Sequence, residues 1–259
     1  MQAHRASLLH FLEDPDRVAE EDSYEYFEDG LLLVDEGRVV EIGTSEQLLP
    51  DLPSHCDLVE HPDALIMPGM VDTHVHYPQT EMVAAYGEQL LEWLETYTFP
   101  IESRFSDVDH ARAIAELFLD ELLRCGTTTA MVFGTSHPQS VEAFFEACEA
   151  RNLRMIAGKV LMDRNAPDDL TDTPESGYRD SKALIEKWHN RGRLRYAVTP
   201  RFAATSTAEQ LCSAGQLLKE YPDVYLQTHL SENHDEVEWA RQLFPERDNY
   251  LDIYDHARL

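Results

Sequence analysis

The pattern of apolar and polar positions changes near residue 62. Residues 30–43 (GLLLVDEGRVVEIG) hold two apolar runs on either side of Asp35-Glu36-Gly37, a pattern typical of a β-hairpin with glycine in its turn. We therefore expect residues 1–62 to form a small β unit. From residue 63 onward, apolar strand-like runs alternate with amphipathic helical stretches, which predicts a second domain over residues 63–259.

This second region contains five strand candidates separated by helical stretches. The expected strands are Leu65–Val75, Thr127–Phe133, Arg154–Leu161, Leu194–Thr199 and Val224–Leu230, and the expected helices are Asp107–Cys125, Ser140–Asn152, Asp180–Asn190, Thr207–Tyr221 and Asn233–Leu243. Such alternation predicts an α/β fold with a parallel sheet and right-handed crossovers. Five βα units fit either an open doubly wound sheet or part of an eight-stranded (β/α)8 barrel.

Composition excludes several classes of partner. The chain has 21 Lys and Arg against 49 Asp and Glu, a formal net charge of −28. Nucleic-acid binding depends on basic side chains that neutralise phosphates, and anionic membrane surfaces repel so acidic a chain. No apolar stretch is long enough for a transmembrane helix, and the N-terminus has no secretory pattern. The four widely spaced cysteines are typical of reduced thiols, so we expect a cytoplasmic protein.

The segment PGMVDTHVHYPQ carries the strongest chemical signal. His74 and His76 are two residues apart at the end of an apolar run, so on a strand both imidazoles would face the same space. A shared metal ion would satisfy both rings, because neutral imidazole is a good ligand for zinc or iron. The alternative is a pair of surface histidines near a turn.

A second signal lies in YLQTHLSENHDEVEW, where His229 closes the fifth strand-like run. This histidine could supply a third ligand. Glu232 follows three residues later, where a general acid/base that handles water at the metal would lie. Alternatively, Glu232 is a carboxylate favoured by the helix dipole at the start of a helix.

Other residues could hold a ligand beside these histidines. Arg201 and Phe202 follow the fourth strand candidate, where a guanidinium offers fixed donors to a carbonyl or carboxylate group. The amide of Gln79 suits the edge of a heterocycle, and Trp93 could form the wall of an aromatic pocket. Spacing alone leaves open that Arg201 is a surface residue and that Trp93 belongs to the core.

The motifs DTHVHYPQ, LLEWLETYTFP, CGTTTA, GKVLMD, VTPRF and THLSEN occur in this order across residues 66–239. In this order they resemble the guanine deaminase branch of the amidohydrolase superfamily. The resemblance implies a (β/α)8 barrel of which only about five βα units are present, together with a portion of a small N-terminal β-sandwich. It also implies hydrolysis of guanine to xanthine and ammonia, with one zinc ion per subunit, in a homodimer.

The same resemblance assigns roles residue by residue. His74, His76 and His229 match metal ligands, Glu232 matches the proton shuttle, and the guanine edge would be held by Gln79, Trp93, Arg201, Phe202 and Glu232. The family has two further ligands, a His and an Asp on later strands, which have no counterpart in these residues. We therefore expect an incomplete barrel that is inactive by itself. There are two alternatives: a related deaminase or chlorohydrolase that acts on a pterin or triazine, and an inactive fragment.

Overall fold

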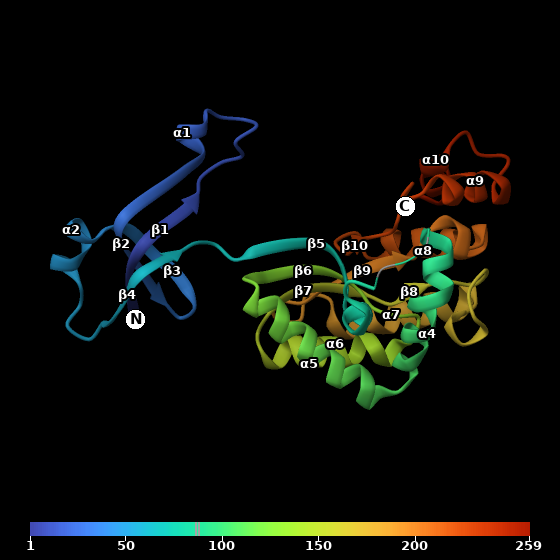
Figure 1. The fold of residues 1–259 in the computed structure, drawn as a ribbon, viewed down its shortest axis with the longest axis horizontal. Coiled ribbons are helices and arrows are strands. Elements are labelled where there is room, and N and C mark those ends of the chain that lie inside the picture. Colours follow the sequence, from blue (N-terminus) through green and yellow to red (C-terminus); the bar gives the residue numbers. More distant parts are fainter. Residues whose placement is uncertain (86, 88) are drawn as a thin grey trace. The chain divides into compact units, whose positions relative to one another are not determined.

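The computed structural model describes residues 1–85, 87 and 89–259 and divides into two compact units (Figure 1). The first unit is Met1–Gly69 and the second is Met70–Leu259. The division lies later than residue 62, because the last strand of the first unit continues to Ile66.

The first unit is a four-stranded sheet with the strand order β3-β2-β1-β4. Its strands are β1 (Gln2–Phe11), β2 (Tyr24–Asp35), β3 (Arg38–Thr44) and β4 (Asp57–Ile66), and its short helices are α1 (Glu20–Ser23), α2 (Ser45–Leu48) and η1 (Leu49–Asp51). β2 and β3 pair antiparallel, as the hairpin pattern predicts. Glu36 and Gly37 both have positive φ angles, 48° and 75°, which suits a tight hairpin turn.

The second unit contains a parallel sheet with the order β10-β9-β7-β6-β5, in which β8 also pairs with β9. The strands are β5 (Met70–His76), β6 (Thr127–Phe133), β7 (Arg154–Gly158), β8 (Val160–Leu161), β9 (Arg195–Pro200) and β10 (Tyr225–Leu226). The single strand expected over Leu65–Val75 is wrong: Pro68 and Gly69 separate the end of β4 from β5. Proline cannot donate a ladder hydrogen bond, so it interrupts the run.

Long helices follow the strands: α5 (Val108–Arg124), α6 (Pro138–Ala150), α7 (Pro174–Trp188), α8 (Ala208–Glu220), α9 (His234–Leu243) and α10 (Tyr250–Ala257). Among the described residues, neighbouring strands follow the order of the sequence without reversal. A doubly wound sheet reverses its order, whereas a barrel does not. α5 packs against α6, α6 against α7 and α7 against α8, and Figure 1 shows α5 and α6 on the same side of the strands. The arrangement is that of a barrel wall.

Local signals account for most helix ends. Asp107 accepts hydrogen bonds from the first turn of α5, and Thr207 caps α8 in the same way; these are the residues at which the two expected helices begin. Gly126 has a φ of 85° and ends α5. α7 begins earlier than expected, because Thr173 and Ser176 form a capping box with Pro174 in the first turn.

The main core lies between the sheet and this helical layer. It contains large side chains that are almost fully buried, among them Tyr77, Phe105, Phe144, Phe145, Met155, Trp188 and Tyr196. The side chains at the carboxyl ends of the parallel strands remain available to line a site. Within the described part of the chain, no helix is both long and apolar enough to cross a membrane.

The sheet leaves no room for a side chain at Gly158. A Cβ atom there would lie 1.8 Å from the carbonyl oxygen of Ala197, so β7 and β9 would have to separate. We expect Gly158→Ala to lower the free energy of unfolding by about 1–3 kcal/mol or more. Urea denaturation followed by tryptophan fluorescence measures this change. An unchanged midpoint would contradict the close packing of the two strands.

Candidate active site

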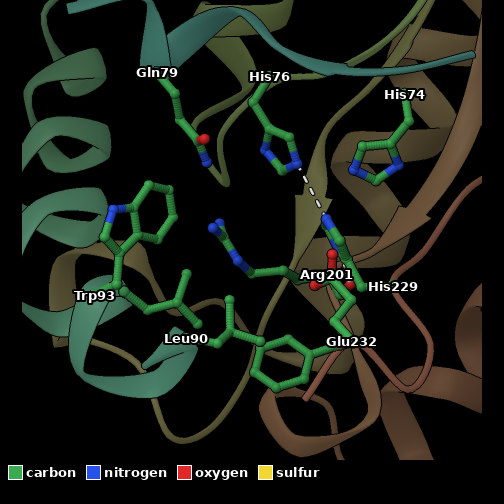
Figure 2. Close-up of a pocket in the computed structure, with 10 residues that line it drawn as sticks. His74, His76, Gln79, Leu90, Trp93, Arg201, His229 and Glu232 are labelled. Atoms are coloured by element: carbon green, nitrogen blue, oxygen red, sulfur yellow. Dashed lines mark hydrogen bonds between the residues drawn. The ribbon is translucent and has the colours of Figure 1, made fainter. Parts of the chain in front are cut away.

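A cavity of about 210 Å³ lies at the carboxyl ends of the parallel strands (Figure 2). Parallel α/β folds place their sites at this edge because the loops that follow the strands converge there. The lining residues are His74, His76, Gln79, Leu90, Trp93, Leu94, Arg201, Phe202, His229 and Glu232. All eight residues that the sequence singled out therefore line one space.

Three histidines form one side of this cavity. His74 and His76 are alternate residues of β5 and point to the same face, as a strand requires. The ring of His229 lies 4.7 Å from that of His74 and 5.1 Å from that of His76, measured between centroids. Phe133, at the end of β6, stacks on His76 with a centroid distance of 4.4 Å and also contacts the other two rings. One ligand nitrogen from each histidine lies within 4.8 Å of the others, so the three rings could hold a metal ion.

His229 reaches this position from a loop, not from a strand. The strand expected over Val224–Leu230 is wrong in extent, because β10 ends at Leu226. The backbone nevertheless continues beside β9: the amide of His229 donates to the carbonyl oxygen of Arg201 at 3.0 Å. The ring nitrogen Nδ1 of His229 also donates to this carbonyl oxygen, at 2.7 Å. That bond places the ring proton on Nδ1 and leaves Nε2 free to bind a ligand.

Burial favours the neutral form of two of these imidazoles, His76 and His229. Burial, reinforced by the charge of Arg201, lowers the pKa of His76 well below its usual value. Burial also lowers the pKa of His229 to about 3, with the hydrogen bond to the Arg201 carbonyl acting in the opposite direction. Nε2 of His76 and Nε2 of His229 are 3.1 Å apart, and Nδ1 of His76 is buried without a hydrogen-bond partner among the described residues. Neutral rings with converging nitrogens are the form that binds a metal ion.

Glu232 stands beside the histidines at the start of α9. Asn233 caps this helix, and the side chain of Glu236 accepts from the amides of Glu232 and Asn233 at 2.8 and 3.3 Å. Burial and the nearby carboxylate of Glu236 raise the pKa of Glu232, whereas His74 and Arg201 act in the opposite direction. A carboxyl group with a raised pKa is suited to accept and return protons near neutral pH.

Arg201 forms the base of the cavity and is 2% exposed. Its Nη1 donates to Oε2 of Glu102 at 2.6 Å, and Glu102 is completely buried. The other carboxylate oxygen of Glu102 accepts from Nε2 of Gln79 at 3.4 Å. Glu102, which the sequence analysis did not identify, thus connects Arg201 and Gln79, which it did identify.

The remaining wall comes from a helical segment of unusual form. α3 (Leu90–Trp93), the π-helical η3 (Leu94–Thr98) and α4 (Phe99–Glu102) follow one another without interruption. Leu90, Trp93 and Leu94 line the cavity, and Figure 2 shows Leu90 and Trp93 opposite the histidines. Single π-helical turns are frequent at functional sites because they redirect side chains within a helix.

Lys159 lies outside this site. It is 1% exposed and pairs with Asp172, which also accepts from Nε2 of Gln210 at 2.6 Å. Its charge is therefore satisfied within the structure that supports α7 and α8.

α10, which the sequence analysis did not predict, holds the loop between His229 and Glu232. The hydroxyl of Tyr254 donates to the carbonyl oxygen of His229 at 2.7 Å. The hydroxyl of Tyr250 donates to Glu236, the carboxylate that binds the amide of Glu232. Two tyrosines one helical turn apart therefore position both ends of the loop.

The sequence model of the amidohydrolase family matches residues 65–258, which include all of these cavity-lining residues. The chain belongs to the amidohydrolase family. This membership agrees with the α/β fold and with the sequential order of the parallel strands.

Several proteins resemble this amidohydrolase closely. Guanine deaminase of Escherichia coli (strain K12) is 54% identical over 94% of the chain and 55% of that relative. The solved structure of E. coli guanine deaminase matches with a TM-score of 0.96 and 52% identity, over 99% of this chain and 60% of that one. A guanine deaminase from C. acetobutylicum with guanine bound in its active site matches with a TM-score of 0.88 and 27% identity, over 100% and 59% of the two chains. The chain therefore spans somewhat more than half the length of these relatives.

Proposed function

We propose that this amidohydrolase takes part in the hydrolytic deamination of guanine to xanthine and ammonia. The observation that carries the proposal is the meeting of three histidines with converging ring nitrogens, one carboxyl group of raised pKa and one buried guanidinium around a single cavity. The similarity to guanine deaminases supports guanine as the substrate. By the resemblance in sequence, we also propose a cytoplasmic homodimer.

The donor set fits a zinc ion held by His74, His76 and His229. Nitrogens bound to tetrahedral zinc at about 2.0–2.1 Å lie about 3.3 Å apart, close to the 3.1 Å between Nε2 of His76 and Nε2 of His229. The carbonyl oxygen of Arg201 orients His229 in the manner usual for a metal-binding histidine. When bound, the ion would supply the activation of water that hydrolysis at neutral pH needs.

Glu232 moves protons during the reaction. Its carboxylate accepts a proton from the attacking water and gives it to ring nitrogen N3 of guanine, as the oxygen adds to C2. As this adduct collapses, Glu232 takes the proton of the new hydroxyl group and gives it to the exocyclic amine, and the bond between C2 and that nitrogen breaks. Ammonia leaves, and xanthine keeps the new oxygen. The raised pKa suits these transfers, because an acid/base group works best with a pKa near the operating pH.

Arg201 and Gln79 hold the purine for this step. The guanidinium of Arg201 donates to the carbonyl oxygen at C6, and Phe202 and Trp93 close the cavity around the ring. Adenine carries an amino group at C6, which cannot accept this hydrogen bond. A site built around such a bond can discriminate by several orders of magnitude, because the wrong ligand leaves a buried donor unpaired.

Metal analysis tests the ligand assignment. We expect His76→Ala to lower zinc content from about one ion per chain to a small fraction of that value, because two histidines remain. His234→Ala is a matched control, since His234 is an exposed residue at the start of α9. Elemental analysis of both purified variants gives the result. Full zinc occupancy in His76→Ala would refute the assignment.

An assay of xanthine formation with a panel of guanine, pterin and triazine substrates tests the reaction itself. Guanine is expected to react fastest. A preference for another ring would be consistent with amidohydrolase chemistry but would refute guanine as the substrate.

A further inference from the structure

We propose that Glu102 is a positioning residue that sets the hydrogen-bond pattern of the pocket, so that the pocket accepts a purine with a carbonyl at C6 beside a ring N–H and rejects a purine with an amino group at C6. The inference rests on the proposed function, because it specifies how the same cavity recognises its purine. It concerns a residue that does not itself line the cavity.

Glu102 contacts two cavity residues from two different elements. One carboxylate oxygen accepts from Nη1 of Arg201, after β9, at 2.6 Å, and the other accepts from Nε2 of Gln79, in η2 (Tyr77–Met82), at 3.4 Å. Glu102 is 0% exposed and Arg201 is 2% exposed. The guanidinium also lies over the ring of Phe99, 5.4 Å from its centroid. Arg201 is thus held from two sides by the segment that contains Glu102.

The chemistry of the carboxylate determines the orientation of the Gln79 amide. An ionised carboxylate only accepts hydrogen bonds, so the side-chain NH₂ of Gln79 must face Glu102. The amide oxygen of Gln79 is then the group left for a ligand. Figure 2 shows the Gln79 amide and the Arg201 guanidinium pointing into the same space, between Trp93 and His76.

The cavity therefore presents a donor from Arg201 and an acceptor from Gln79. A 6-oxopurine offers the matching groups, a carbonyl oxygen and a ring N–H. A 6-aminopurine offers an amino group where the carbonyl would be and would leave the buried guanidinium donor unpaired. Glu102 imposes this pattern although it touches no substrate, since it constrains both residues at once.

Ligand binding tests the proposal without turnover. Hypoxanthine and adenine differ at C6 and have no amino group at C2, so neither is deaminated there. Their dissociation constants are measured by calorimetry with zinc-loaded, full-length protein. We expect the unaltered protein to prefer hypoxanthine by about 100-fold or more, and Glu102→Gln to reduce this preference below about 10-fold. The side chain of glutamine can donate as well as accept, so Gln79 would no longer be held in one orientation.

Two further variants separate positioning from a structural role. Glu102→Asp keeps a group that only accepts, so we expect weaker binding of both purines but a preserved preference for hypoxanthine. Glu95→Gln is the matched control, because Glu95 is an exposed residue of the same helical segment and does not line this cavity; its preference should be unchanged. A preference that survives in Glu102→Gln, or that Glu102→Asp loses to the same extent, would overturn the proposal.

A crystal structure of Glu102→Gln gives a second measurement that needs no ligand. We expect the Gln79 amide to turn or the Arg201 guanidinium to leave its place, and unchanged positions of both would overturn the role of Glu102. If the unaltered protein binds neither purine, the proposed substrate fails, and this structure still decides whether Glu102 positions the two side chains. Should Glu102→Gln not fold, Glu102→Asp must retain the preference for hypoxanthine, and its loss would count against the proposal.

Discussion

Glu232→Gln should retain its metal and lose most of its activity. The substitution keeps the size of the side chain but removes its ability to accept and return a proton. A positioned acid/base group contributes about 10²–10⁴-fold, so kcat for xanthine formation should fall by that factor. The assay uses the protein in its full natural length, with zinc content measured on the same samples.

Glu238→Gln is the matched control for this experiment. Glu238 lies on α9, the helix that follows Glu232. It is exposed, pairs with Arg241 and accepts a hydrogen bond from Gln242. Its activity should be unchanged. Near-normal ammonia release by Glu232→Gln would remove Glu232 from the mechanism, whereas loss of zinc would show that the substitution disturbs the histidines.

The pH profile of the unaltered enzyme should report the same carboxyl group. In the proposed reaction Glu232 acts first as a base, so activity should require its deprotonated form and should fall as the pH drops through its pKa. Because burial and Glu236 raise this pKa, the acid limb of the profile should lie at a higher pH than an ordinary glutamate would give. Glu236→Gln removes one of the two causes and should move the limb toward lower pH.

Removing Arg201 should cause the second large effect, this time on stability. Arg201→Met leaves the carboxylate of Glu102 buried without its counter-charge. Such a change typically costs about 3–5 kcal/mol. Urea denaturation followed by tryptophan fluorescence measures it in the relevant unit, because the three tryptophans, Trp93, Trp188 and Trp239, all lie within Met70–Leu259.

Two comparisons show whether the cost arises from the buried charge. Adding Glu102→Leu to Arg201→Met removes both charges and should recover much of the lost stability. Arg241→Met breaks an exposed ion pair with Glu238 and should change stability by less than about 1 kcal/mol. If the double variant is no more stable than Arg201→Met, the loss does not come from an uncompensated charge.

Many strands and helices of the second unit can be predicted from the sequence, because their positions depend on local patterns. The apolar run at Thr127–Phe133 has the same bounds as β6, and the two helices expected to begin at Asp107 and Thr207 are capped by those residues. The spacing of His74 and His76 implies a common face on a strand, and the structure has both on β5. Hydrophobic periodicity and capping are encoded within a few residues, so one sequence is enough to detect them.

Other features depend on contacts between distant segments, which a single sequence does not reveal. Glu102 appears in the sequence as one acid among 49, yet it is fully buried because Arg201, far along the chain, meets it. β10 ends at Leu226, although the amides of Gln227 and His229 still donate to the carbonyl oxygens of Val198 and Arg201. The role of α10 depends on hydrogen bonds from Tyr254 to the carbonyl oxygen of His229 and from Tyr250 to Glu236, on the preceding helix. No composition or spacing rule identifies such partners.

The close contact between α8 and α10 makes the chemistry sensitive to a remote position. A Cβ atom at Gly215 would lie 2.0 Å from the carbonyl oxygen of Ala257, so even alanine there would push the C-terminal helix away from its neighbour. Tyr254 would move with it and release the carbonyl oxygen of His229. A random-mutagenesis screen for inactive variants should therefore recover replacements of Gly215, on the outer layer of the fold, in addition to substitutions of the residues that line the pocket.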